Sequence, residues 1–168
     1  RLSDQNEDLL KENIDLAIRI GAVKSEGLVA MPLGTSTRRV YAAPTYLDRH
    51  GLPREPNELT GHNCIGFTLL EHYDNWHFTH IAQELDVAIK GNVTSNSSEA
   101  IREMVLSGLG ISLSPEWLFA SDVEQGSVRT VLDDYQTTAL PVSAVLSRER
   151  RRSARTMAFI DFLREHLM

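Results

Sequence analysis

Residues 96–115 constrain the fold more than any other stretch of the sequence. Their pattern predicts a helix, a glycine stop at Gly108, a short strand and the start of a second helix at Pro115. The strand is expected because Ile111 and Leu113 alternate with two serines. The helix has one apolar face, formed at three- and four-residue steps by Ala100, Ile101, Met104 and Val105. This alternation of helix and strand indicates an α/β fold.

The front of this helix is the strongest candidate for a binding site. Asn96 is expected to cap the helix, with Glu99 completing a capping box. The first turn presents free N–H groups and the positive end of the helix dipole, beside the hydroxyls of Ser97 and Ser98. Such an end can hold a carboxylate, a phosphate or another polar ligand oxygen. The same residues also describe a helix that is capped only for stability.

Composition excludes several classes of protein. The chain has 168 residues, of which 42% are hydrophobic and 24% charged, as is typical of a soluble globular protein. The net charge of −6 argues against a nucleic-acid-binding surface, and no apolar run approaches a membrane span. The single cysteine, Cys64, excludes an internal disulfide and fits a reducing, cytoplasmic compartment. Charged residues throughout 1–20 argue against a signal peptide, and the first residue is Arg1 instead of Met, which indicates a fragment, a processed product or the ordered part of a longer protein.

The beginning of the chain predicts a parallel sheet. Ser3 or Asp4 is expected to cap a short helix that runs to residue 12. Residues 14–21 then predict a strand whose apolar face is formed by Ile14, Leu16, Ile18 and Ile20. Ligands bind beyond the carboxyl ends of the strands in parallel sheets, so Ile20 and Gly21 are expected at the edge of a cleft.

The rest of the sequence alternates between short strands and helices. Strands are predicted at residues 28–33, 38–43, 64–67, 76–78, 85–89, 93–95, 128–132 and 140–146, with those between 76 and 95 forming a small meander. Helices are predicted at 44–50, at 115–125 and after Ser153, the last with a buried stripe of Met157, Ile160, Leu163 and Leu167. The first and last portions can therefore form one lobe and the middle another, with two crossings and a cleft between them.

Several segments together resemble the effector-binding (regulatory) domain of LysR-type transcriptional regulators. Each segment is weak evidence alone, but their order and spacing are specific. The match runs nearly the whole length of the chain, and its segments are residues 15–21, 33–34, 39–47, 51–53, 56, 59, 62–65, 76–78, 96, 99–100, 108–111 and 140–142.

The resemblance implies a fold similar to a type II periplasmic binding protein, in which two α/β subdomains enclose an effector cleft. The first subdomain would comprise residues 1–39 and 142–168, and the second residues 40–141. The family carries about one more strand and helix before a segment like the first four residues here, so the first subdomain is expected to lack its opening strand and helix. The missing helix commonly packs in the family's dimer interface.

The resemblance also implies a set of binding residues and partners. The cleft would be lined by Ser3, Asp4, Ile20, Gly21, Phe67, Thr68, Asn96, Ser97 and Ser98. The partner is a small-molecule effector, and the intact regulator is expected to be a homo-oligomer. It would meet DNA only through an N-terminal winged helix-turn-helix that is not in this sequence. No cofactor, metal or membrane is implied.

Other chemistry is weakly indicated. His72, His77 and His80 invite a metal site, but no carboxylate or cysteine completes a recurring ligand spacing. Cys64 near His62 lacks a nucleophile elbow and a third catalytic partner, so no catalytic residue is predicted. The arginine-rich run at 148–152 is interpreted as a solvated surface. The alternative to a sensor is a free-standing solute-binding protein or an enzyme on a similar two-lobed scaffold.

Overall fold

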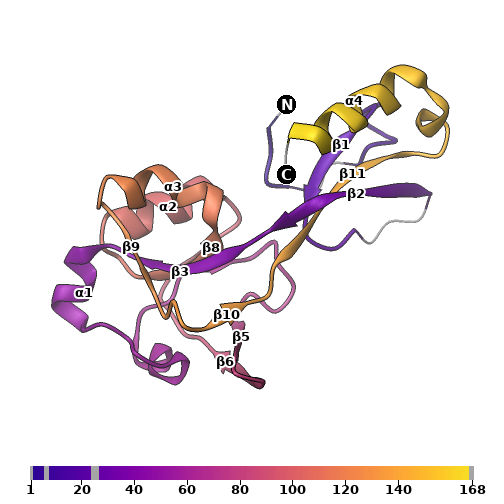
Figure 1. Ribbon diagram of the computed structural model, residues 1–168. Coiled ribbons are helices and arrows are strands. Elements are labelled where there is room, and N and C mark those ends of the chain that lie inside the picture. The colour runs from indigo at the N-terminus through magenta and orange to yellow at the C-terminus, as the bar shows by residue number, and fades with distance from the viewer. Residues whose placement is uncertain (1, 6–7, 24–26, 167–168) are drawn as a thin grey trace. The chain divides into compact units, whose positions relative to one another are not determined.

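A computed structural model describes residues 2–5, 8–23 and 27–166 of the chain (Figure 1). Its contacts divide the chain into two compact units. Unit 1 comprises Arg1–Gln5 and Thr37–Thr138, and unit 2 comprises Asn6–Ser36 and Ala139–Met168. Each unit therefore combines segments that lie far apart in the sequence.

The centre of unit 1 is an antiparallel sheet in the order β8-β3-β9. These strands are Ile111–Pro115, Arg38–Ala42 and Arg129–Val131, and Val40 of the central strand pairs with both Leu113 and Val131. Successive side chains of β3 point to opposite faces of the sheet. Val40 and Ala42 consequently belong to one apolar core, and Tyr41 between them belongs to another.

Two helices cover the Tyr41 face of this sheet: α2 (Ser98–Leu106) and α3 (Glu116–Glu124) (Figure 1). Of the apolar face predicted for α2, Ile101 and Val105 are buried, and Ala100 and Met104 are partly buried. The ring of Phe119 in α3 stacks on Tyr41 with centroids 4.5 Å apart. Arg102 of α2 donates two hydrogen bonds, of 2.7 and 2.6 Å, to the buried Asp122 of α3, and this pair ties the helices together.

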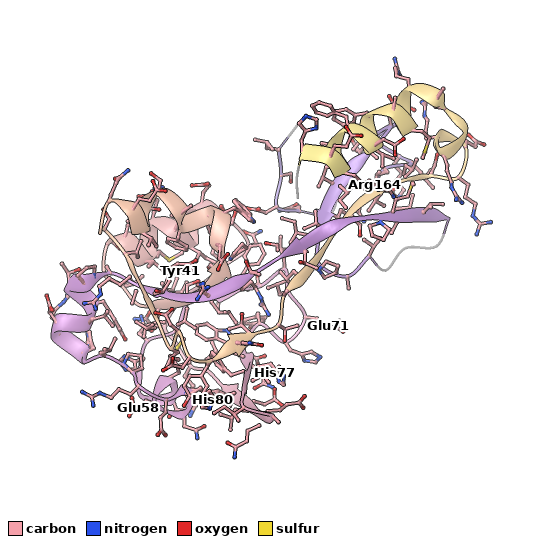
Figure 2. All side chains as sticks on the ribbon, viewed as in Figure 1. Tyr41, Glu58, Glu71, His77, His80 and Arg164 are labelled. Atoms are coloured by element: carbon pink, nitrogen blue, oxygen red, sulfur yellow. The ribbon has the colours of Figure 1, made fainter. Side chains whose placement is uncertain are left out.

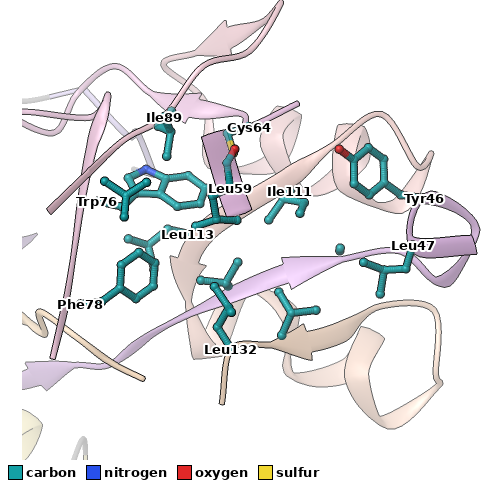
Figure 3. Close-up of a cluster of buried hydrophobic side chains, with 14 residues drawn as sticks. Tyr46, Leu47, Leu59, Cys64, Trp76, Phe78, Ile89, Ile111, Leu113 and Leu132 are labelled. Carbon is teal, nitrogen blue, oxygen red and sulfur yellow. The ribbon is translucent and has the colours of Figure 1, made fainter. Parts of the chain in front are cut away.

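A second core lies on the Val40 face (Figure 3). It receives Trp76 and Phe78 from β5 (Asn75–His80) and Val87 from β6 (Gln83–Ala88), which form an antiparallel hairpin. The short β10 (Gln136–Thr137) pairs with β5 and completes a sheet in the order β10-β5-β6. The helix α1 (Pro44–His50) and the 3-10 helix η1 (Pro56–Gly61) add Tyr46, Leu47 and Leu59 to the same core.

Two very short strands place the front of α2. The strands β4 (Gly66–Phe67) and β7 (Thr94–Ser95) pair in parallel, with Phe67 opposite Ser95. The expected meander is therefore wrong in one respect, because β7 pairs with β4 instead of with the β5–β6 hairpin. The helix α2 follows β7 within three residues.

Unit 2 is a three-stranded sheet with one covering helix. Its strands β1 (Ala17–Ile20), β11 (Leu140–Ser147) and β2 (Leu28–Ser36) lie in the order β1-β11-β2, and both pairs are antiparallel. After a short 3-10 helix, η2 (Arg150–Arg152), the helix α4 (Ala154–His166) packs on the sheet. Its buried Ile160 meets Leu33, Ala144 and Leu146. Of the predicted stripe on α4, Leu167 lies outside the described residues.

The predictions for the beginning of the chain were the least accurate. The predicted helix over residues 3–12 is not formed in the described part, where residues 9–13 make turns instead. Asp8 Oδ1 accepts the N–H groups of Leu10 and Lys11, so Asp8, and not Ser3 or Asp4, caps the turns that follow. The expected parallel sheet is antiparallel, because β11 from the end of the chain lies between β1 and β2. Ile18 and Ile20, which belong to the predicted apolar face, are 44% and 42% exposed.

Candidate functional site

The front of α2 is assembled from the ends of β4 and β7. Beyond these strands, Thr68 N–H donates to the Ser95 carbonyl at 2.9 Å, and Ser97 N–H donates to Ser95 Oγ at 3.0 Å. Phe67 and Thr68 thus lie next to the residues that lead into the helix. Because parallel strands end on the same side, their carboxyl ends and the first turn of α2 meet at one place.

The cap of α2 differs from the prediction. Ser97 is the N-cap residue, with extended backbone (φ −118°, ψ 122°), and its Oγ accepts the N–H of Ala100 at 3.4 Å. Asn96, the predicted cap, lies one residue outside the helix and is exposed, so the predicted capping box with Glu99 does not form. Both residues are good caps, and the sequence could not distinguish between them.

A carboxylate from the beginning of the chain already sits on this helix. Asp4 Oδ2 accepts the backbone N–H of Ser98 at 2.8 Å, and the Ser98 hydroxyl donates to the same carboxylate at 3.0 Å. The partly positive helix end and the serine hydroxyl favour a negative group there. The structure thus brings together Asp4, Ser97 and Ser98 of the predicted site. Ser3 lies beside Asp4, where its Oγ accepts the N–H of Gln5 at 3.2 Å.

Two features of this site escaped sequence analysis. Ser95, whose hydroxyl accepts the Ser97 N–H, was predicted only as part of a strand. The pairing of Asp4 with Ser98 joins residues 94 positions apart, and only the cap signals in each segment were visible in the sequence.

The remaining predicted residues, Ile20 and Gly21, belong to unit 2. Ile20 ends β1, and Gly21 follows with a φ of 104°, a conformation that favours glycine. Gly21 N–H donates to the Pro141 carbonyl at 2.8 Å. These residues were predicted because ligands bind at the carboxyl ends of strands in parallel sheets. Since β1 is antiparallel to its neighbour, that argument does not apply to them.

Unit 2 also contains an open groove of about 490 Å³. None of its lining residues belongs to the predicted site. They are Leu9, Leu10, Asn13, Ile14, Ser147, Glu149, Arg150 and Ser153. Arg150 is paired with Asp15 at 2.8 Å, so its charge is already compensated.

His77 and His80, both labelled in Figure 2, have side-chain partners. His77 Nδ1 lies 2.9 Å from Asp86 Oδ1, and the His80 ring packs 4.9 Å from the ring of Tyr135. Within the described residues, no group of three or more His, Cys, Asp or Glu side chains could hold a metal ion. Burial raises the pKa of the Cys64 thiol to about 12, which makes it a poor nucleophile. The described residues also include no helix that is long and apolar enough to cross a membrane.

Comparison with known families assigns this fold. A family model described as the LysR substrate binding domain matches residues 1–168. The chain therefore belongs to the LysR substrate-binding domain family, and its α/β architecture is the two-subdomain, periplasmic-binding-protein-like fold of that family.

Several regulators are similar to the chain. It is 34% identical over 161 residues to the HTH-type transcriptional regulator CrgA of Neisseria meningitidis serogroup C, covering 95% of this chain and 54% of that protein. It is 33% identical over 166 residues to PtxR of Pseudomonas aeruginosa, covering 98% of this chain and 53% of that protein. The chain thus spans about half the length of the curated relatives it matches. The solved regulatory domain of CrgA superposes with a TM-score of 0.82 at 33% identity, covering 97% of this chain and 81% of that one.

Proposed function

We propose that the chain is the ligand-sensing regulatory domain of a cytoplasmic DNA-binding transcriptional regulator. The proposed regulatory subdomains are residues 1–39 with 142–168 and residues 40–141. A small-molecule effector binds to the predicted residues, and its binding changes how an attached helix-turn-helix meets DNA. The proposed partners are the effector, a second copy of the regulator and, through the helix-turn-helix, DNA. The domain has no catalytic role in this proposal.

The observation that carries the proposal is the carboxylate on the front of α2. Ser98 donates both its N–H and its hydroxyl to the Asp4 carboxylate, and this supports the binding of an oxygen ligand at this helix end. CrgA and PtxR are both named HTH-type transcriptional regulators, and this supports the sensor over a solute receptor or an enzyme. Effector control further requires that the ligand bind one conformation of the regulator more tightly than another.

The test is a double substitution at the helix front. Small metabolites are first screened by thermal shift against the intact regulator, and the affinity of each hit is then measured by calorimetry. We expect Ser97→Ala with Ser98→Ala to weaken binding by about tenfold or more, since each lost hydrogen bond is worth roughly 1 kcal/mol. Folding should persist, because losing the Ser97 cap costs only about 1 kcal/mol.

The matched control is Ser107→Ala, the same change at the other end of α2. There the hydroxyl donates to the Met104 carbonyl at 2.8 Å and lies away from the helix front. We expect this variant to keep wild-type affinity. Unchanged affinity in a well-folded double variant would refute the proposed site.

A further inference from the structure

Arg38 is the first residue of β3, and no carboxylate among the described residues pairs with its guanidinium. Its Nε donates to the Thr138 carbonyl at 2.9 Å, and Thr137 Oγ1 donates to the Arg38 carbonyl at 2.6 Å. Within the described part of the chain, its guanidinium makes no ion pair and no other hydrogen bond. The Nη donors therefore have no hydrogen-bond acceptor among the residues that the structure describes.

The surroundings of Arg38 make this unusual. The side chain is half-buried, and desolvation lowers the pKa of its guanidinium. Desolvating a charge without compensating it is unfavourable, so partly buried arginines are normally paired with a carboxylate or bind a ligand anion. Its planar donors match carboxylate and phosphate oxygens in a two-point contact.

The nearby carboxylates of Glu116 and Asp133 form ion pairs with Arg39, the residue after Arg38. Arg39 Nε donates to Glu116 at the start of α3, and its Nη1 lies 3.5 Å from Asp133 Oδ1. Hydrogen bonds from Thr37 and from Arg39 hold the pKa of the Glu116 carboxyl below its usual value. Successive residues of a strand point to opposite faces, so Arg38 faces away from this cluster.

We propose that the guanidinium of Arg38 binds the anionic group of a small molecule, a carboxylate or a phosphate. The front of α2 is a weaker anion site than its dipole alone would suggest, because the carboxylate of Asp4 already occupies it. This inference does not depend on the effector site at α2. It assigns the anion to a different element of unit 1.

The test measures thermal stability and calorimetric affinity with two probes, sodium malonate and sodium phosphate, against sodium chloride at equal ionic strength. We expect saturable stabilisation of the wild-type chain by at least one probe. The probe that saturates identifies the group as carboxylate or phosphate. Arg38→Met should weaken that binding by about tenfold or more. Without the probe, its melting temperature should be unchanged or higher, since an uncompensated charge has been removed.

Two controls make the test specific. Arg39→Met removes an adjacent arginine that is already paired, so it should lower the melting temperature while keeping the response to the probe. Ser97→Ala with Ser98→Ala should also keep the response, and this separates the inference from the proposed effector site. If Arg38→Met does not fold, Arg38→Lys is used instead. It keeps the charge but loses the two-point contact, and it should bind the probe more weakly.

Three results would overturn the inference. One is the absence of any saturable response in the wild-type chain. Another is a response that survives Arg38→Met, or Arg38→Lys where that variant is used. The third is a response lost in Arg39→Met or in the serine double variant but kept when Arg38 is changed, because the anion would then bind elsewhere.

Discussion

At the scale of single residues, Gly91 packs tightly against the backbone of Cys64. Cys64 N–H donates to the Lys90 carbonyl at 2.8 Å, which brings the two backbones side by side. A Cβ built on Gly91 would lie 1.8 Å from the Cys64 carbonyl oxygen, so no side chain fits without moving a backbone. The same segment passes Ile111, since Ile65 N–H donates to its carbonyl at 2.8 Å. The two backbones can therefore approach this closely only because Gly91 has a hydrogen atom where other residues have a side chain.

We therefore expect Gly91→Ala to lower the free energy of unfolding by roughly 1–3 kcal/mol, the usual cost of forcing extra volume into a packed region. Urea denaturation followed by circular dichroism measures the change. Gly61→Ala is the matched control, because a Cβ there has nothing within 4 Å. It should stay within about 1 kcal/mol of the wild type. Equal effects of the two substitutions would contradict the close approach.

At the scale of elements, α1 is attached to the following segment through Tyr46. The Tyr46 hydroxyl accepts the N–H of Asn63 at 2.9 Å and lies 3.2 Å from His62 Nδ1. The His50 ring stacks on the Tyr46 ring, with centroids 4.5 Å apart. Burial lowers the pKa of His62, the nearby His50 lowers it further, and Glu58 opposes the shift. This junction therefore favours a neutral imidazole at His62.

The consequence is a defined dependence on pH. A histidine whose pKa is lowered by folding binds protons more readily in the unfolded chain, so its contribution to stability is full above pH 6.5 and is lost as the pH falls below that value. We expect the wild-type chain to lose more stability between pH 7.5 and about pH 5 than the His62→Gln variant does. Urea denaturation at each pH measures this difference.

The comparison at pH 7.5 serves as the internal control, since the imidazole is then mostly neutral in both the folded and the unfolded chain. Any gap between the two proteins at that pH reports packing and hydrogen bonding alone. Parallel pH profiles for His62→Gln and the wild type would show that His62 does not sense acid through this junction.

Most elements were predictable because local signals and tertiary packing agree. The predicted stop at Gly108 has a positive φ, and so do Gly51 and Gly126, which directly follow the helices predicted at 44–50 and 115–125. The prediction for the beginning of the chain was wrong because it relied on local signals, whereas tertiary packing determines the structure there. Leu9 is buried, but turns replace the expected helix. The two-residue β10 carries no periodic signal, since its pairing with β5 is a long-range contact.

The candidate site was predictable to the same degree. Serines are typical of the first residues of a capped helix, so the serines at the front of α2 could be predicted as site residues from the sequence. The occupant of that helix end could not be named, because nothing in a sequence pairs residue 4 with residue 98. The sequence Arg38-Arg39 also gives no sign of how differently the two side chains are placed. They face opposite sides of one strand, and among the described residues only Arg39 forms ion pairs with carboxylates.

At the scale of the whole molecule, charge limits what this chain can do without further domains. Its net charge is −6, and DNA affinity depends on neutralising phosphates with clustered cations. The only arginine-rich run, at 148–152, is partly compensated, since Arg150 pairs with Asp15 at 2.8 Å and Arg155 lies 3.7 Å from the same carboxylate. The relatives it resembles, by contrast, are named for a helix-turn-helix and are about twice as long.

We therefore expect the 168-residue chain to have no sequence-specific affinity for DNA. Repeated selection from random duplexes at about 0.15 M salt should enrich no motif, and gel shifts should show no retained complex, because nonspecific contacts weaken steeply with salt. The intact regulator, tested in parallel, should enrich a motif if the proposed function is correct. A motif enriched by the isolated chain would mean that the basic run or another surface reads bases directly, and the regulatory domain would then take part in DNA recognition itself.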